Sequence, residues 1–364
     1  MNLKERGMLA QVRCPVRLAP HELDAYLERG WFRMRQNIFT TNFVHFKNEF
    51  YSAIWLRVKL HEFSQDKTRD KLFKRNAGFR TEIRPAIITP EKEELYSQYK
   101  KHLPFEPMGT LGQLLLADFS PVNIYNTYEA AVYDGNKLIA IGFFDVGADS
   151  SAGIAAVYDH DYGKYSLGKF LIYLKMEYCK GLSMQYFYPG YFVPGYAAFD
   201  YKLSIGKSAI QFLQLKSQQW MPLEKFFPDD IPYEVMLLRL KEVQKLLAQS
   251  KLESKILKYE FFDANLFPEL MNAQLFDFPI MLFCSDHVDD DLNHVIVFDV
   301  RDDQYHLLQC VPVYAPNAPN ADPDFYSEYI IKEEQAVLST TASAEMVDWI
   351  ITFLNAKKNL GIIT

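Results

Sequence analysis

Two acidic residues in neighbouring apolar segments are the candidates for acid–base chemistry. Asp145 ends the segment 137–145, and Glu129 lies near the start of the segment 128–134. When an amide is made from an activated ester, positioning and removal of a proton from the attacking amine supply most of the effect, and a carboxylate at a strand end suits the second task. The alternative for either residue is a solvent-facing acid without a chemical role.

A second kind of chemistry is indicated where an apolar segment passes into a helix. Tyr165, Ser166, Leu167 and Gly168 stand at this helix start, where Ser166 is expected to cap the helix. Unpaired backbone amides and the positive end of the helix dipole can bind a phosphate group there. The alternative for Gly168 is close packing of the helix against the sheet.

The elements that must position these residues follow one another as strand, turn, strand, strand, helix and strand. The expected strands are 128–134, 137–145, 153–159 and 184–188, with a hairpin turn at Asp134-Gly135-Asn136 and a helix that Gly181 ends. This order is that of the GCN5-related acyltransferases. The sequence therefore predicts an α+β fold built on a GCN5-related acyltransferase-like mixed sheet with flanking helices.

The charge is distributed unevenly along the chain. The net charge of −7 comprises a balance of +8 over residues 1–105, −2 over 106–225 and −13 over 226–364. A basic part can bind phosphates, although two oppositely charged domains that pack together are the alternative.

Composition changes along the chain predict three domains. We expect a small basic N-terminal α+β domain over 1–88, the acyltransferase-like catalytic domain over 89–227, and an extra acidic α/β domain of unknown role over 228–364. We expect residues 63–80 to form a polar, basic connector. The Pro228 to Pro232 stretch marks the second boundary.

The composition excludes several classes of protein. No apolar run reaches the roughly 18 residues that a membrane span needs, and the N-terminus has no signal-peptide block. The 4 cysteines are scattered and the 8 histidines show no ligand spacing, so we expect reduced thiols, no metal and no cofactor. A cytoplasmic protein without membrane partners is the expectation.

Several short phrases occur in the same order as in the aminoacyl-tRNA–protein transferases, the family of the arginyl-transferases and the bacterial leucyl-transferases. Between about residues 14 and 225 they are Cys14-Pro15, Leu27-Glu28-Arg29-Gly30-Trp31, Lys74-Arg75-Asn76, Tyr158-Asp159-His160-Asp161-Tyr162, Ser166-Leu167-Gly168, Gly190-Tyr191, Pro194-Gly195 and Tyr201-Lys202. The sequence resembles this family over that range.

The resemblance implies transfer of an arginyl or leucyl group from aminoacyl-tRNA to the N-terminal amine of acceptor proteins, as in N-degron formation. It implies substrate-binding roles for Tyr128, Arg75, Gly190, Tyr201 and Lys202. For a single cation such as Arg75 or Lys202, the alternative is a solvated surface position.

The expected partners are aminoacyl-tRNA and protein or peptide N-termini. The tRNA phosphates would meet the helix start at Tyr165, Ser166, Leu167 and Gly168, together with the basic residues Lys71 and Lys74.

The sequence departs from the family pattern in two places. The family's cysteine cluster is replaced within 45–55 by a stretch without cysteine, so any metal or redox cofactor that it supports elsewhere is expected to be absent here. The residues 196–200 are Tyr-Ala-Ala-Phe-Asp, where the family carries Cys-Pro-Lys-Met-Arg. The loss of two cations beside the expected pocket leaves open a catalytically silent relative that binds RNA or protein. The other alternative is an acyl-CoA-dependent N-acyltransferase on the same fold.

Overall fold

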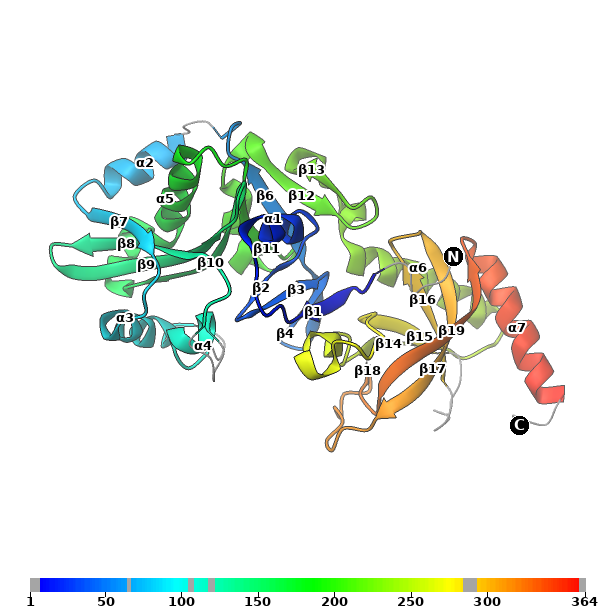
Figure 1. Ribbon diagram of the computed structural model, residues 1–364. Coiled ribbons are helices and arrows are strands. Elements are labelled where there is room, and N and C mark those ends of the chain that lie inside the picture. The colour runs from blue at the N-terminus through cyan, green and yellow to red at the C-terminus, as the bar shows by residue number, and fades with distance from the viewer. Residues whose placement is uncertain (1–6, 64–66, 104–107, 117–121, 284–292, 360–364) are drawn as a thin grey trace.

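The computed structural model describes residues 7–63, 67–103, 108–116, 122–283 and 293–359 (Figure 1). Its strands form an eight-stranded sheet, a six-stranded sheet in the C-terminal part and two small N-terminal sheets, with helices packed against the two large ones. The predicted α+β class is confirmed.

The eight-stranded sheet carries the elements that were expected to position the site. Its order is β13-β12-β6-β11-β10-β9-β8-β7, in which β10 and β11 are parallel and the other neighbours are antiparallel. The strands are β6 (Ile54–Lys59), β7 (Arg80–Pro85), β8 (Thr127–Asp134), β9 (Lys137–Val146), β10 (Ser150–Tyr158), β11 (Tyr186–Phe192), β12 (Ile210–Gln214) and β13 (Gln219–Pro222). The predicted hairpin is confirmed, because Asp134 pairs with Lys137 and Gly135 takes the positive φ of 56° that the tight turn requires.

Helices cover both faces of this sheet. On one face, α5 (Leu167–Gly181) packs its apolar residues against β8, β9 and β10, and α2 (Lys67–Arg75) lies beside α5. On the other face, α3 (Pro90–Lys100) and α4 (Leu111–Leu115) cover β9 and β10 (Figure 1). The segment 63–80, expected to be a polar, basic connector, contains the helix α2. The helix is rich in charged residues, and its apolar residue Leu72 is buried and anchors it to the rest of the protein.

The N-terminal elements pack against the middle strands of this sheet, and two of them, β6 and β7, belong to it. Beyond β6 and β7, they are β1 (Ala10–Arg13), α1 (Pro20–Glu28), β2 (Phe32–Met34), β3 (Asn37–Thr41), β4 (Phe43–Phe46) and β5 (Glu49–Ser52). The order β1-β3-β2 makes a small sheet, and β4 and β5 form a hairpin. Because β6 and β7 belong to the eight-stranded sheet, the predicted division at residue 88 falls between strands of one sheet.

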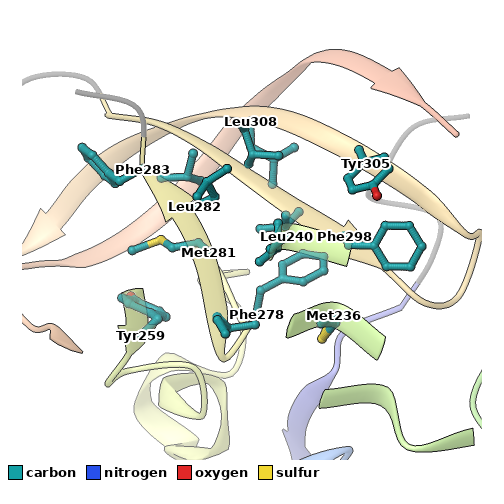
Figure 2. Close-up of a cluster of buried hydrophobic side chains, with 14 of the residues drawn as sticks. Met236, Leu240, Tyr259, Phe278, Met281, Leu282, Phe283, Phe298, Tyr305 and Leu308 are labelled. Carbon is teal, nitrogen blue, oxygen red and sulfur yellow. The ribbon is translucent and has the colours of Figure 1, made fainter. Parts of the chain in front are cut away.

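The C-terminal part has its own sheet and core. Its order is β18-β14-β15-β16-β17-β19, with helices α6 and α7 packed against it. The elements are α6 (Pro232–Gln249), β14 (Lys255–Tyr259), β15 (Ile280–Phe283), β16 (Asn293–Asp299), β17 (Gln304–Tyr314), β18 (Phe325–Tyr326), β19 (Ile330–Thr340) and α7 (Ser343–Asn359). Figure 2 shows Met236 and Leu240 of α6 among aromatic and aliphatic residues of the strands, where they form one apolar core.

Short 3₁₀ helices complete the chain. They span His160–Tyr165, Ala197–Ser204, Lys207–Ala209, Leu223–Lys225, Pro228–Asp230, Ala264–Leu266 and Pro268–Leu270. No described helix combines the length and the apolar composition that crossing a membrane requires.

The C-terminal core is completed by residues from the N-terminal segment. Leu9, Phe43 and Phe50 are buried in the same cluster as the α6 residues. The Phe50 ring stacks on Tyr233 at 6.2 Å and meets Phe262 edge-on at 5.1 Å between ring centroids. The β4–β5 hairpin therefore fastens the two large parts of the molecule together by burial of apolar surface.

The burial of Phe50 predicts a large effect of one substitution. Phe50→Ala should lower the free energy of unfolding by about 3–5 kcal/mol, because the ring is 3 % exposed and its removal leaves a cavity. Phe267→Ala is the matched control, because Phe267 is 58 % exposed and its loss should cost less than about 0.5 kcal/mol. Chemical denaturation of the two variants measures the difference. Equal stabilities would show that Phe50 does not fasten the domains.

Candidate functional site

The parallel strands β10 and β11 separate after a short contact. They pair from Ser150 with Tyr186 to Ala152 with Tyr188, and beyond that point β10 follows β9 and β11 follows β6. Each strand has a register irregularity just past the contact, at Gly153 in β10 and before Gly190 in β11. Such irregularities bend a strand, so the carboxyl ends of β10 and β11 diverge. Ligands of open sheets bind at divergent carboxyl ends of parallel strands.

The start of α5 lies at this opening. Ser166 has a left-handed backbone with φ 54°, and its side chain makes no capping hydrogen bond, so the expected cap is wrong. The Arg75 guanidinium donates instead to the Lys164 carbonyl at 3.0 Å and to Ser166 Oγ at 3.4 Å. A cation from α2 thus stands beside the first amides of α5, which is favourable for a phosphate group.

Gly168 has a packing explanation. A Cβ at this position would lie 3.2 Å from the Tyr158 ring, so the glycine permits close contact between α5 and β10. The neighbouring residues Tyr165 and Leu167 serve packing too, because Leu167 is buried and the Tyr165 ring lies 4.8 Å from the Phe79 ring. Their phosphate-binding role stays a prediction that depends on the backbone amides.

Lys202 lies on the other side of the opening. Its ammonium donates to the Tyr191 carbonyl at 2.7 Å and stands over the rings of Tyr191 and Phe199 at 5.5 and 5.1 Å. Burial among these groups lowers the pKa of Lys202 to about 8. Gly190 has a φ of +88°, a backbone conformation that favours glycine. A Cβ at this position would also lie 3.3 Å from Lys202 Nζ and would crowd the ammonium group.

A hydrogen bond joins the first turn of α5 to the segment that carries Lys202. Lys169 in the first turn of α5 donates to Ser204 Oγ at 2.7 Å, two residues after Lys202. Tyr201 is 46 % exposed and close enough to Tyr158 for the two phenols to interact electrostatically. The structure therefore brings together Arg75 and the α5 start on one side and Gly190, Tyr201 and Lys202 on the other. Lys71 and Lys74 are exposed on α2 nearby.

Asp145 lies at the opposite end of the sheet from the α5 start. Its Oδ1 accepts from Arg33 Nη1 at 2.8 Å and from Thr127 Oγ1 at 2.7 Å, and the side chains of Arg33 and Asp145 are 3 % and 0 % exposed. Its Oδ2 is buried without a hydrogen-bond donor among the described residues. The alternative of a solvent-facing acid is wrong for Asp145, and its role as general base stays a prediction.

Glu129 is also fully buried, on the sheet face that α3 covers. Lys92 Nζ donates to both carboxylate oxygens at 2.6 Å, Arg84 Nε donates at 2.8 Å and the Ile87 amide at 3.2 Å. These contacts make Glu129 the anchor of α3, because an unpaired buried carboxylate would be costly. Tyr128 lies near the far end of α5, with its ring 5.9 Å from that of Tyr178. Neither residue reaches the opening, and their predicted roles stay predictions.

A buried lysine was missed by the sequence analysis. Lys175 of α5 is 2 % exposed, and its ammonium donates to the Phe143 carbonyl at 3.5 Å. Burial lowers its pKa to about 8. Its Nζ fills the space above two glycines, 3.3 Å from where a Cβ of Gly142 would stand and 3.7 Å from that of Gly153. Two glycines in adjacent predicted strands and a lysine on the apolar face of the following helix were the sequence features that could have indicated this buried lysine.

One group of described side chains has the donor types for a cation, and it lies in the C-terminal part. Asp299, Asp302 and His306 place one ligand atom each within 4.8 Å of one another. Arg301 Nε donates to Asp299 Oδ1 at 2.8 Å, and Arg301 Nη2 donates to Oδ2 at 2.7 Å. These hydrogen bonds hold the pKa of the Asp299 carboxyl below its usual value. His306 is bonded to Ser339 and Asp302. We interpret the group as an ion-paired turn between β16 and β17, because its donor atoms already have protein partners.

Comparison with known proteins agrees with the sequence motifs. Residues 91–211 match the family model described as "Arginine-tRNA-protein transferase, C terminus". The aspartate/glutamate leucyltransferase of Leptospira interrogans is 26% identical over 216 residues, which cover 58% of this chain and 82% of that protein. That of Helicobacter hepaticus is 26% identical over 182 residues, covering 48% and 73%. The resemblance to the aminoacyl-tRNA–protein transferase family is thereby confirmed.

Among solved structures, the C-terminal domain of a putative lysylphosphatidylglycerol synthetase from Agrobacterium fabrum is similar over 39% of this chain and 47% of that one. The sequence identity is 16% and the TM-score is 0.32.

The buried lysine predicts a pH-dependent stability. The pKa of Lys175 is about 8 in the folded protein and 10.5 for a free lysine, so the unfolded chain binds more protons between these values. The free energy of unfolding should therefore rise as the pH rises from about 8 to about 10.5. Lys175→Met should be more stable than the wild type by on the order of 2–3 kcal/mol at pH 7, with the gap closing toward pH 10.5.

Urea denaturation at several pH values measures this gap. Lys225→Met, at an exposed position, is the control and should show no gap. A Lys175→Met variant less stable than the wild type at every pH would contradict the prediction.

Proposed function

We propose that the protein transfers an amino acid from an aminoacyl-tRNA to the N-terminal amine of an acceptor protein. The observation that carries the proposal is that residues 91–211, the stretch that matches the transferase family model, contain β10, α5 and β11, which form the opening beside Lys202. The similar leucyltransferases are named for aspartate and glutamate, so an acceptor with an acidic first residue is the first candidate. The proposed setting is the cytoplasm.

The reaction asks for positioning more than for strong acid–base groups. The amine nitrogen attacks the ester carbonyl carbon, a C–N bond forms, and the C–O bond to the tRNA ribose breaks as the ribose hydroxyl leaves with a proton. The α5 start with Arg75 would hold a phosphate of the tRNA end. Asp145 and Glu129 remain the proposed bases, but both are buried away from the opening, so either would have to gain access to the amine as well as give up its present cation partner.

Lys202 is the proposed ligand for an anionic group of the acceptor. Its present partner among the described residues is a neutral carbonyl, so its charge is not matched by a carboxylate there. A carboxylate that entered the opening would gain a charge-assisted hydrogen bond in a partly desolvated place. Lys202 belongs to the Tyr201-Lys202 motif shared with the family, so it is a cation that this chain keeps although residues 196–200 lack two others.

The test is a transfer assay with charged tRNA pools and labelled peptides that begin with Asp, Glu or Arg. We expect tRNA-dependent transfer, and Lys202→Met should lower kcat/KM for the Asp and Glu peptides by about 10–100-fold because a charge-assisted bond is removed. Lys225→Met, which removes the same charge at an exposed site, should leave kcat/KM unchanged. Transfer from acyl-CoA without tRNA, or peptide binding without transfer, would replace the proposal with one of the two other functions.

The basic residues of α2 predict a salt-dependent affinity for tRNA. Replacing Lys71, Lys74 and Arg75 by Ala should weaken binding and reduce the slope of log affinity against log salt by roughly 0.7–0.9 for each tRNA phosphate that these side chains no longer neutralise. Filter binding at several salt concentrations measures the slope.

A charge-matched control replaces Lys225, Lys245 and Lys332 by Ala, away from α2. It should leave both affinity and slope unchanged. If the α2 variant behaves like this control, the basic helix does not contact the tRNA.

A further inference from the structure

A cavity lies between the catalytic part and the C-terminal part. Its volume is about 640 Å³, within the range of sites that bind small molecules or short peptide segments. Strand β5 and the turn at Pro194 and Gly195 line one side, and α6, β14 and β15 line the other. Figure 1 shows β14 and α6 on the side of the C-terminal part that faces the N-terminal strands.

The charges in this cavity are of both signs. Two of its lysines are paired, Lys258 with Glu49 at 3.0 Å and Lys255 with Asp324 at 3.9 Å. The other two charged residues, Glu234 and Lys241, are exposed and form no ion pair or hydrogen bond among the described side chains.

Glu234 and Lys241 stand on one face of α6. They are seven residues apart, or two turns, which corresponds to about 10 Å along the axis. The opposite face of α6 is buried in the C-terminal core through Met236 and Leu240 (Figure 2). The helix therefore presents an unmatched anion and an unmatched cation to the cavity, separated by the length of about three residues of an extended chain.

A wall of aromatic rings joins the cavity to the opening. Gly195 packs against the Tyr51 ring, with 3.9 Å between its Cβ position and Cε1. The Tyr196 ring lies 5.7 Å from that of Tyr51 and 6.0 Å from that of Phe199, which carries the Lys202 ammonium on its face. Gly190 and Gly195 are five positions apart in the sequence, so the two sites are at most about 18 Å apart along the chain.

We propose that this cavity binds the acceptor polypeptide beyond its first residues, so that the C-terminal domain takes part in choosing the acceptor. The inference rests on the proposed function, because the acceptor amine must then lie at the opening beside Lys202. An extended chain that starts there reaches the cavity at about its fourth to eighth residue. Aromatic side chains in the wall of the cavity can pack against the side chains of a polypeptide, and the lining residues of both charges can pair with its charged side chains.

Nucleic acid is a poorer occupant of the cavity. Three carboxylates and three lysines line it, so the lining offers no net positive charge to phosphate groups. The balance of charge over residues 226–364 is −13, which repels phosphate groups. The tRNA is therefore assigned to the basic α2 side, and the polypeptide to the acidic C-terminal side.

The test uses the full chain and fluorescent 12-residue peptides that share their first three residues. One peptide carries Asp and Glu at positions 4–8, and the other carries Lys and Arg there. Lys241→Glu should weaken binding of the acidic peptide about 5–10-fold and tighten binding of the basic peptide, and Glu234→Lys should do the reverse. Fluorescence anisotropy gives Kd without any transfer step.

Two controls keep the outcomes separate. Lys245→Glu makes the same charge change on α6 outside the cavity and should leave both Kd values unchanged. A peptide of the shared three residues should not respond to the cavity variants. Charge-dependent binding without transfer would reject the proposed function and keep a peptide site. Transfer that is insensitive to Lys241→Glu and Glu234→Lys would overturn this inference and leave the proposed function standing.

Discussion

The divergence of β10 from β11 is the constraint on which the candidate site depends. A parallel pair that stayed hydrogen-bonded along its length would close the sheet, but here the pairing ends at Ala152 and Tyr188. Each strand keeps its outer neighbour, β9 or β6, so the main-chain groups on the outer sides remain satisfied while the inner sides part. The α5 start, Gly190 and Lys202 all lie around this gap.

The local part of the fold was predictable from the sequence. The turn at Asp134-Gly135, the strands beside it and the helix ended by Gly181 depend on neighbouring residues, and their bounds agree with the structure to within a few positions. The place of β6 between β11 and β12 was not predictable, because it depends on pairing between distant segments. Sequence alone gives no measure of such pairing.

Site residues that belong to a continuous sequence motif were predictable, whereas contacts between residues far apart in the sequence were not. Ser166 and Lys202 stand in phrases that match a family, and the structure places both at the opening. Asp145 looked accessible because strand ends often face water, and its burial depends on Arg33, which lies 112 residues earlier. Lys175 was missed because the lysine stands on the apolar face of a helix, and its neighbours become visible once β9 and β10 are paired.

The hairpin β4–β5 is held in place by residues of the C-terminal part. The resembled family carries a cysteine cluster near this position, whereas here Phe43 and Phe50 are buried in the C-terminal core. Burial of two aromatic rings fixes the hairpin, together with the Glu49–Lys258 ion pair and the hydrogen bond that the Tyr233 amide donates to Ser52 Oγ. The hairpin is therefore the joint between the two large sheets.

The central place of β6 has a consequence for how the chain folds during synthesis. This strand leaves the ribosome long before its neighbours β11 and β12, and five of its six residues are buried in the finished sheet. Until those partners emerge, β6 has two unsatisfied edges and is prone to pair with other chains. Folding of the large sheet is therefore expected to be slow and late, with the nascent N-terminal segment depending on chaperones for protection.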